Sequence, residues 1–231
     1  VAERDSNDWH TPALYIKAVK AVLGQINLDP FSSALANETV GAFRYFTIED
    51  DAIRMDRPWA QFPDDGPTET FFMNPPYSRG VIDGAVARFL KELPHLSAGI
   101  VLVNNATETQ WFQAMMKRCK AVCFVDHRIA FVSPDNKQES GNTRGQVFFF
   151  FGPLFARMKF SKVFKKIGPV SEMTPETDPD PLPTIDPPPP DAAQVIAAQQ
   201  RHIDALEARI DAQSQRDELE GTGQIAQLNR T

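Results

Sequence analysis

The hydrophobic and polar positions of this chain follow two kinds of spacing. Residues 12–23 place apolar side chains at helical intervals between Thr11-Pro12 and Gly24, and therefore predict an amphipathic helix. Further helices are expected at 81–93 and 107–117. Short apolar runs bounded by turn residues predict strands at residues 26–29, 42–47, 70–73, 100–103, 121–125 and 146–151. Helices and strands that alternate in this way are typical of an α/β fold with a mostly parallel sheet.

The composition divides the chain near residue 170. All seventeen phenylalanines lie in residues 1–170, which hold enough apolar material for a domain with its own core. Residues 171–191 end in four consecutive prolines and predict an extended Pro-rich linker. Residues 221–231 are expected to be a flexible tail.

Between the linker and the tail, residues 192–220 predict a single amphipathic helix. Ile196, Ile203 and Ile210 lie one heptad apart, but the companion positions are polar. Two interpretations stay open: a short coiled coil that forms a homo-oligomer or binds a partner, and a helix that packs back onto the first domain.

Charge is distributed unevenly along the chain. The net charge is −6, yet residues 111–170 carry eleven Lys and Arg against three Asp and Glu, a balance of +8. A local basic excess of this size favours contact with a phosphate backbone, although a solvated basic face would have the same composition. The long polar loop at 132–145 lies within this region, and Arg128, Lys137 and Arg144 are candidates for contacts with nucleic acid.

Other features narrow the class of protein. No apolar run is long enough to cross a membrane and the N-terminal residues do not resemble a leader, so we expect a soluble cytoplasmic protein. The cysteines, Cys119 and Cys123, lie among apolar residues without a second pair of metal ligands. We interpret them as buried thiols and expect no metal site.

The most specific chemical signal is Asn74-Pro75-Pro76-Tyr77, which follows the strand expected at 70–73. Ligand sites of open α/β sheets form where parallel strands end. One chemistry that such a loop would suit is the activation of an exocyclic amine such as that of adenine. This amine is a poor nucleophile because its lone pair is delocalised into the ring. Two acceptors for its N–H groups, the Asn74 side-chain oxygen and the Pro75 carbonyl, would draw the nitrogen towards tetrahedral geometry.

The two prolines would fix the direction of that carbonyl, and Tyr77 could stack on the base. The alternative is that these four residues form only a rigid turn. Their place directly after a strand favours the catalytic interpretation.

Several motifs in order resemble the phage-type DNA N-6-adenine methyltransferase (Dam) family over residues 7–152. They are Asp8-Trp9-His10-Thr11-Pro12, Leu28-Asp29-Pro30-Phe31, Asn74-Pro75-Pro76-Tyr77, Val101-Leu102-Val103 with Thr107-Glu108-Thr109-Gln110-Trp111-Phe112, and Arg128-Ile129-Ala130-Phe131. The resemblance implies a Rossmann-like methyltransferase core that binds S-adenosylmethionine (AdoMet) and methylates N6 of a flipped adenine in double-stranded DNA. It also implies a phage- or prophage-encoded enzyme in a bacterial cytoplasm.

The resemblance carries over to a cofactor site with uneven strength. Asp29-Pro30-Phe31 matches the start of the AdoMet motif, but Ser32-Ser33-Ala34 replaces the Gly-rich turn that adenine methyltransferases carry there. Thr11-Pro12 resembles a segment that contacts the AdoMet carboxylate, although it could equally be a plain helix start. Trp9 is either a cofactor wall or a core residue.

Two further assignments depend on position along the chain. One of the acidic residues after the strand at 42–47, Asp50 or Asp51 in particular, could bind the ribose hydroxyls of the cofactor, or the group could serve only to solvate a loop. Phe131 could pack on the target base opposite Tyr77, or be an ordinary core residue. The interval between Asp29 and Asn74 is short, which predicts a reduced sheet there.

Two other functions fit parts of the same pattern. The Asn-Pro-Pro-Tyr loop would also suit an RNA adenine or a protein glutamine as methyl acceptor; the basic region favours nucleic acid over protein. A DNA-binding module with a vestigial catalytic site is the alternative from another class. Turnover of AdoMet by the purified protein separates that alternative from an enzyme.

Overall fold

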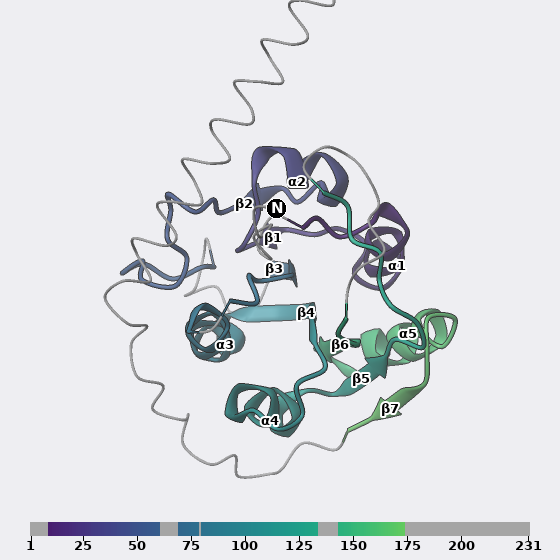
Figure 1. Cartoon of the computed structure of the whole chain (residues 1–231). Coiled ribbons are helices and arrows are strands. Elements are labelled where there is room, and N and C mark those ends of the chain that lie inside the picture. The colour runs from purple at the N-terminus through teal and green to yellow at the C-terminus, as the bar shows by residue number, and fades with distance from the viewer. Residues whose placement is uncertain (1–8, 61–68, 79, 134–142, 174–231) are drawn as a thin grey trace, which may run out of the picture. The chain divides into compact units, whose positions relative to one another are not determined.

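The computed structural model describes residues 9–60, 69–78, 80–133 and 143–173 (Figure 1). The helices in these ranges are α1 (Ala13–Leu23), α2 (Ala34–Val40), α3 (Val81–Glu92), α4 (Gln110–Arg118) and α5 (Leu154–Phe164), with a 3-10 turn η2 (Leu93–His95). The strands are β1 (Leu28–Asp29), β2 (Arg44–Tyr45), β3 (Glu69–Met73), β4 (Leu96–Asn104), β5 (Ala121–Phe124), β6 (Gln146–Phe151) and β7 (Val170–Glu172).

The strands form a single seven-stranded sheet in the order β2-β1-β3-β4-β6-β5-β7. The pairings of β2 with β1, β1 with β3 and β3 with β4 are parallel. The pairings of β4 with β6, β6 with β5 and β5 with β7 are antiparallel. A mostly parallel sheet therefore describes the first half well, whereas β6 enters the second half in the opposite direction. The short β1 and β2 agree with the reduced sheet expected before Asn74.

Helices cover both faces of the sheet (Figure 1). α3 and α4 pack on one face, against Phe71, Val101 and Phe149, while α1 and α5 pack on the other, against Phe72, Leu102 and Phe148. Neighbouring residues of one strand thus bury their side chains in opposite layers, because side chains alternate across a strand. This is why the central strands are continuous apolar runs rather than alternating ones.

Within the described residues, the expected helices and strands are present, with shifted ends. The helix predicted at 12–23 is α1, and the strand predicted at 100–103 is the core of the longer β4. Four elements were not predicted: α2, α5, β7 and the 3-10 turn η2. Cys119 and Cys123 are free and buried, and burial raises the pKa of each thiol to about 12.

The sheet continues past the domain boundary expected at residue 170, because β7 runs to Glu172 and pairs with β5. Residues 171 and 172 therefore belong to the sheet and not to a linker. The rest of the linker, the helix expected at 192–220 and the tail at 221–231 lie outside the described residues, so those parts of the organisation stay predictions.

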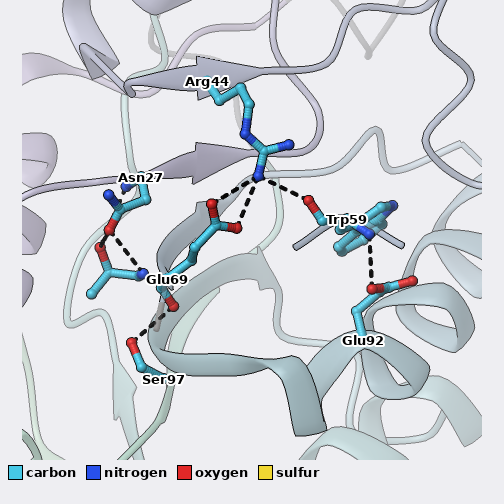
Figure 2. A network of polar contacts seen from close by, with 7 residues as sticks. Asn27, Arg44, Trp59, Glu69, Glu92 and Ser97 are labelled. Carbon is cyan, nitrogen blue, oxygen red and sulfur yellow. Dashed lines mark hydrogen bonds and ion pairs between the residues drawn. The ribbon is translucent and has the colours of Figure 1, made fainter. Parts of the chain in front are cut away.

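At the amino-terminal edge of the parallel strands, a polar network ties the strands together (Figure 2). One Arg44 nitrogen donates to both Glu69 carboxylate oxygens, at 3.0 and 2.8 Å, and to the Trp59 carbonyl at 2.9 Å. The Trp59 backbone N–H donates to Glu92 at 2.9 Å, and Glu92 also pairs with Arg88 at 2.7 Å. Charges of opposite sign are matched at this edge.

Candidate active site

The residues of the chemical motifs meet at the carboxyl-terminal edge of the parallel strands. β1 ends at Asp29 and β3 ends at Met73, directly before Asn74. The two strands pair in parallel, Leu28 with Phe71, so Asp29 and Asn74 leave the sheet at the same edge. β4, the next strand, ends there too, at Asn104. Carboxyl ends of parallel strands are where open α/β sheets bind ligands.

Two side chains from distant parts of the chain hold the amide of Asn74. Its Nδ2 donates to the Thr11 hydroxyl oxygen at 3.0 Å, across 63 positions of sequence. Its Oδ1 accepts the Tyr77 hydroxyl proton at 2.5 Å. An amide oxygen has two lone pairs, so Oδ1 keeps capacity for one more donor.

The rest of the loop is partly enclosed. Pro75 is buried, and none of the described residues donates a hydrogen bond to its carbonyl. Tyr77 packs between the two helical layers, with its hydroxyl also 3.4 Å from the Leu102 carbonyl oxygen. Burial raises the pKa of Tyr77 well above its usual value, so the phenol stays protonated and can act as a donor.

Asp29 is a buried carboxyl group beside this loop. It is 3% exposed, and its Oδ1 accepts the Phe31 backbone N–H at 3.1 Å. Burial raises the pKa of Asp29 to about 7, while hydrogen bonds from Phe31 and Ser32 oppose the shift. Among the described residues, no Lys or Arg forms an ion pair with it. A buried carboxylate without a cation is suited to a ligand that brings positive charge.

The residues after Asp29 form a helix start where the motif of related enzymes has glycines. The Ser33 hydroxyl accepts the Ala36 backbone N–H at 3.1 Å and so caps α2. Pro30 is buried, and the Phe31 ring meets Trp59 edge-to-face, with ring centroids 5.8 Å apart. The segment Ser32-Ser33-Ala34, which replaces the Gly-rich turn, therefore begins α2 with Ser33 as its N-cap. Asp29 remains at the end of β1.

The segment before α1 is held against the chain around residue 132. His10 and Val132 exchange two backbone hydrogen bonds, at 2.8 and 3.0 Å. Pro12 occupies the N-cap position of α1, and Thr11 is buried with its hydroxyl on the Asn74 amide. Trp9 is partly buried against the α1 and α5 layer. The structure therefore brings Thr11 to the loop that begins at Asn74, a contact that local sequence does not reveal.

The acidic side chains of the loop after β2 form hydrogen bonds and an ion pair with other residues of the same loop. An Asp50 carboxylate oxygen accepts the Thr47 backbone N–H at 2.8 Å, and Asp51 pairs with Arg54 at 3.1 Å. Asp51 has a φ of 44°, which marks a tight turn. The loop begins beside Asp29, because the Phe46 N–H donates to the Asp29 carbonyl at 3.0 Å. These contacts favour a loop-building role; the ribose contact stays a prediction.

The basic candidates leave the sheet at the same carboxyl-terminal edge. Arg128 follows β5, Arg144 precedes β6, and both side chains are exposed. Gln146, the first residue of β6, donates to Asn104 at 3.1 Å and so ties this segment to the end of β4. The Arg128 guanidinium lies over Gly145. Lys137 lies outside the described residues, so its role stays a prediction.

Phe131 is only 6% exposed and belongs to the core beneath α1 and α5. This burial favours the interpretation as a core residue over contact with a target base. Tyr77 packs against the same cluster and against the one beneath α3 and α4, but it is only partly buried. Stacking of Phe131 on a base would require it to emerge from the core beneath α1 and α5.

A family model for DNA N-6-adenine-methyltransferase (Dam) matches residues 1–168. The match covers β1 to β6 and every motif described above. The chain belongs to the Dam family. No curated protein matches the sequence closely enough to add to this assignment.

Membership in the Dam family gives the general activity, methylation of adenine in DNA, and makes the protein a transferase with a DNA substrate. It implies AdoMet as the methyl donor. Within the described ranges, no group of three or more His, Cys, Asp or Glu side chains could hold a metal ion. The helices of the same ranges include none that is both long and apolar enough to span a membrane.

Proposed function

We propose that this Dam-family chain transfers the methyl group of AdoMet to N6 of an adenine that has been rotated out of duplex DNA. The observation that carries the proposal is the Asn74 amide, held by Thr11 and Tyr77 at the carboxyl-terminal edge of the sheet with one acceptor position of Oδ1 left over. The DNA substrate class follows from the family. We further propose that the core is Rossmann-like.

The chemistry assigned to the loop is orientation of the amine. Asn74 Oδ1 and the Pro75 carbonyl accept the two N–H groups, and the nitrogen lone pair is thereby turned towards the methyl group. Methyl transfer would form the N6–carbon bond at the expense of the carbon–sulfur bond of AdoMet, and the amine would then lose a proton to solvent. Buried acceptors in fixed positions stabilise such a transition state without reorganisation. The Tyr77 ring is assigned to stack on the base.

Asp29 fits the cofactor assignment by its charge. The ammonium and sulfonium groups of AdoMet are cations, and Asp29 is a buried carboxyl group without a cationic partner among the described residues. Bound AdoMet would supply the electrophilic methyl group. We assign Thr11 and Pro12 to the neighbourhood of the cofactor carboxylate, and Phe31 to an apolar wall.

The test is to incubate the full chain with tritiated AdoMet and one of three acceptors: unmethylated duplex DNA, RNA of the same sequence, or a glutamine-containing peptide. Nucleosides from the DNA are then separated, and N6-methyladenine is the expected product. Thr39→Val, an exposed position on α2, serves as a control for handling of variants. Label on another base, on RNA or on the peptide in preference to DNA would overturn the proposal.

A further inference from the structure

The described basic residues of segment 111–170 do not form one surface, because the structure distributes them between the two edges of the sheet. One group lies between the end of α4 and the start of β5, at the amino-terminal edge of the parallel strands: Lys117, Arg118 and Lys120. Arg157 of α5 pairs with Glu172 at 3.5 Å, and Glu172 lies beside Ala121 at that same edge. The charge of these residues is therefore remote from the candidate active site.

The C-terminal end of α5 lies at the other edge. β6 runs antiparallel to β4, so the helix that follows it returns towards the edge where β4 and β5 end. The Ile167 carbonyl accepts from the Asp126 N–H at 3.2 Å, and the Pro169 carbonyl accepts from the Phe124 N–H at 3.0 Å. A Cβ at Gly168 would be 1.9 Å from the Phe124 carbonyl oxygen, so this close approach requires glycine. The end of α5 is thus packed directly against the end of β5.

Two lysines stand at this position. Lys165 is the C-cap residue of α5 and Lys166 follows it, and both side chains are exposed. The contact between α5 and the end of β5 lies only two residues before Arg128, which is exposed as well. The neighbouring Asp126 carboxylate is already engaged, 2.6 Å from His127 Nδ1. The two lysines and Arg128 therefore place positive charge along the edge of the candidate active site.

We propose that Lys165 and Lys166 bind the phosphate backbone of the duplex beside the target adenine. DNA is the substrate class of the family, and a base can reach Asn74 only if the duplex lies across the carboxyl-terminal edge. α5 also covers the same face of the sheet as α1, and Thr11, just before α1, binds the Asn74 amide. The proposal rests on the function proposed above, because that function brings the adenine to Asn74.

The alternative role for the two lysines is to complement the negative end of α5, which would affect stability alone. A phosphate contact instead contributes about −0.9 to the log–log salt slope of DNA affinity. The double variant Lys165→Ala/Lys166→Ala should therefore bind DNA about 10-fold or more weakly at moderate salt, with a slope smaller in magnitude by about 2. Lys165→Arg/Lys166→Arg should keep both affinity and slope, because arginine also binds phosphate.

The matched control is Lys91→Ala/Lys159→Ala, which removes the same charge from two other exposed lysines. Lys91 lies in the last turn of α3, at the amino-terminal edge. The Lys159 amino group lies over the Phe155 ring, 5.9 Å from its centroid, and so towards the start of α5. Long-range attraction by net charge would be equal in the two alanine double variants, so a difference between them reports position.

Anisotropy of a fluorescently labelled duplex at several salt concentrations measures affinity and slope, and thermal unfolding checks each protein. Single-turnover methylation at saturating DNA should stay within about 2-fold of wild type, because phosphate contacts hold substrate and transition state alike. Equal losses of affinity in the two alanine double variants, an unchanged slope in Lys165→Ala/Lys166→Ala, or arginine variants as weak as the alanine ones would each overturn the proposal. Failure of the proposed function is seen separately: wild type would then form no N6-methyladenine, while anisotropy would still decide the role of the lysines.

Discussion

The two ends of the parallel strands treat buried charge differently. At the amino-terminal edge, Arg44 meets Glu69 (Figure 2). Arg88 meets Glu92 at the same edge, so charges of opposite sign neutralise each other within the protein. At the carboxyl-terminal edge, Asp29 is buried without such a partner among the described residues, and burial raises its pKa to about 7. The charges of the two ion pairs at the amino-terminal edge are matched, whereas Asp29 at the carboxyl-terminal edge is available to pair with a cationic ligand. This difference favours a stabilising role for the first edge and a ligand-binding role for the second.

The largest effect on the methylation rate should come from Asn74, at the carboxyl-terminal edge. Asn74→Ala removes the acceptor for the amine, so the single-turnover methylation rate should fall at least about 100-fold, as in comparable sites that lose one preorganised hydrogen-bonding group. Affinity for AdoMet should be nearly unchanged, because the acceptor acts mainly in the transition state. Asn74→Asp should be milder, since a carboxylate still accepts. A near-normal rate in Asn74→Ala would remove this loop from the mechanism.

Substitutions at the amino-terminal edge should lower the free energy of unfolding and leave the methylation rate unchanged. Arg44→Met removes the ion pair that Arg44 forms with the largely buried Glu69, and we expect a loss of about 2–3 kcal/mol in the free energy of unfolding. Urea denaturation measures the loss. Because the network lies at the opposite edge from Asn74, the rate of the folded fraction should not change. A large loss of rate with normal stability would show that the two edges are not separate.

Asp29 should give a dependence on pH with a defined sign. Its folded pKa, about 7, lies above the ordinary value of 3.8, so the favourable contribution of the protonated carboxyl is full below pH 3.8 and is lost as pH rises through about 7. Asp29→Asn should therefore raise the unfolding temperature by a few degrees relative to wild type at pH 8, and by less at pH 5.

The same group should link AdoMet affinity to pH. A cationic ligand favours the ionised carboxyl, so wild-type affinity should increase as pH rises through about 7, and Asn at position 29 should abolish that increase. Calorimetric titrations at pH 6, 7 and 8 measure it. Identical pH profiles for the two proteins would mean that Asp29 does not face the cofactor's charge.

Affinity for DNA should depend on salt through the basic residues at the same edge. Counterion release gives a log–log slope of about −0.9 for each phosphate neutralised. Arg128→Ala and Arg144→Ala should each weaken binding and reduce the magnitude of the slope by about 1. Lys91→Ala, an exposed site at the end of α3, is the control. A slope that neither arginine changes would place the phosphate contacts elsewhere.

The smallest effect is expected from the Tyr77 hydroxyl. Tyr77→Phe keeps the stacking ring but removes the donor to Asn74 Oδ1, which leaves that oxygen free to accept from the amine. We expect a loss of only about 2- to 5-fold in single-turnover rate, the size of one neutral hydrogen bond. A loss of about 100-fold or more would show that the Tyr77 hydroxyl, and not only its ring, is needed for the reaction.

Much of the fold could be predicted because its strands are unusually apolar. The apolar segments around residues 71, 101 and 149 contain few polar residues, so their burial can be predicted from the sequence. The exposed face of α5 hid that helix, since Leu154, Phe155 and Met158 are more than half exposed and break the expected amphipathic pattern. α2 and β7 are too short for periodicity to identify.

The candidate site was predictable only as separate motifs. Asn74-Pro75-Pro76-Tyr77 was found because it follows a recognisable strand, and Asp29 was found because Asp29-Pro30-Phe31 resembles the start of the AdoMet motif. The contact between Thr11 and Asn74 joins positions 63 residues apart, and no local pattern encodes such a pairing. The same limit applies to the burial of Phe131, which depends on how α1 and α5 cover the sheet.

The insertion of β6 between β4 and β5 has a consequence for how the chain can assemble. β6 carries four consecutive buried phenylalanines and is made after both of its neighbours. Until residue 151 has been synthesised, β4 and β5 each keep an open edge and an uncovered apolar face. Unpaired edges and non-local pairing slow folding and promote aggregation. A nascent or truncated chain that ends before β6 should therefore require chaperones to stay soluble. We expect the sheet to form only after β6 has been synthesised, and not stepwise from the N-terminus.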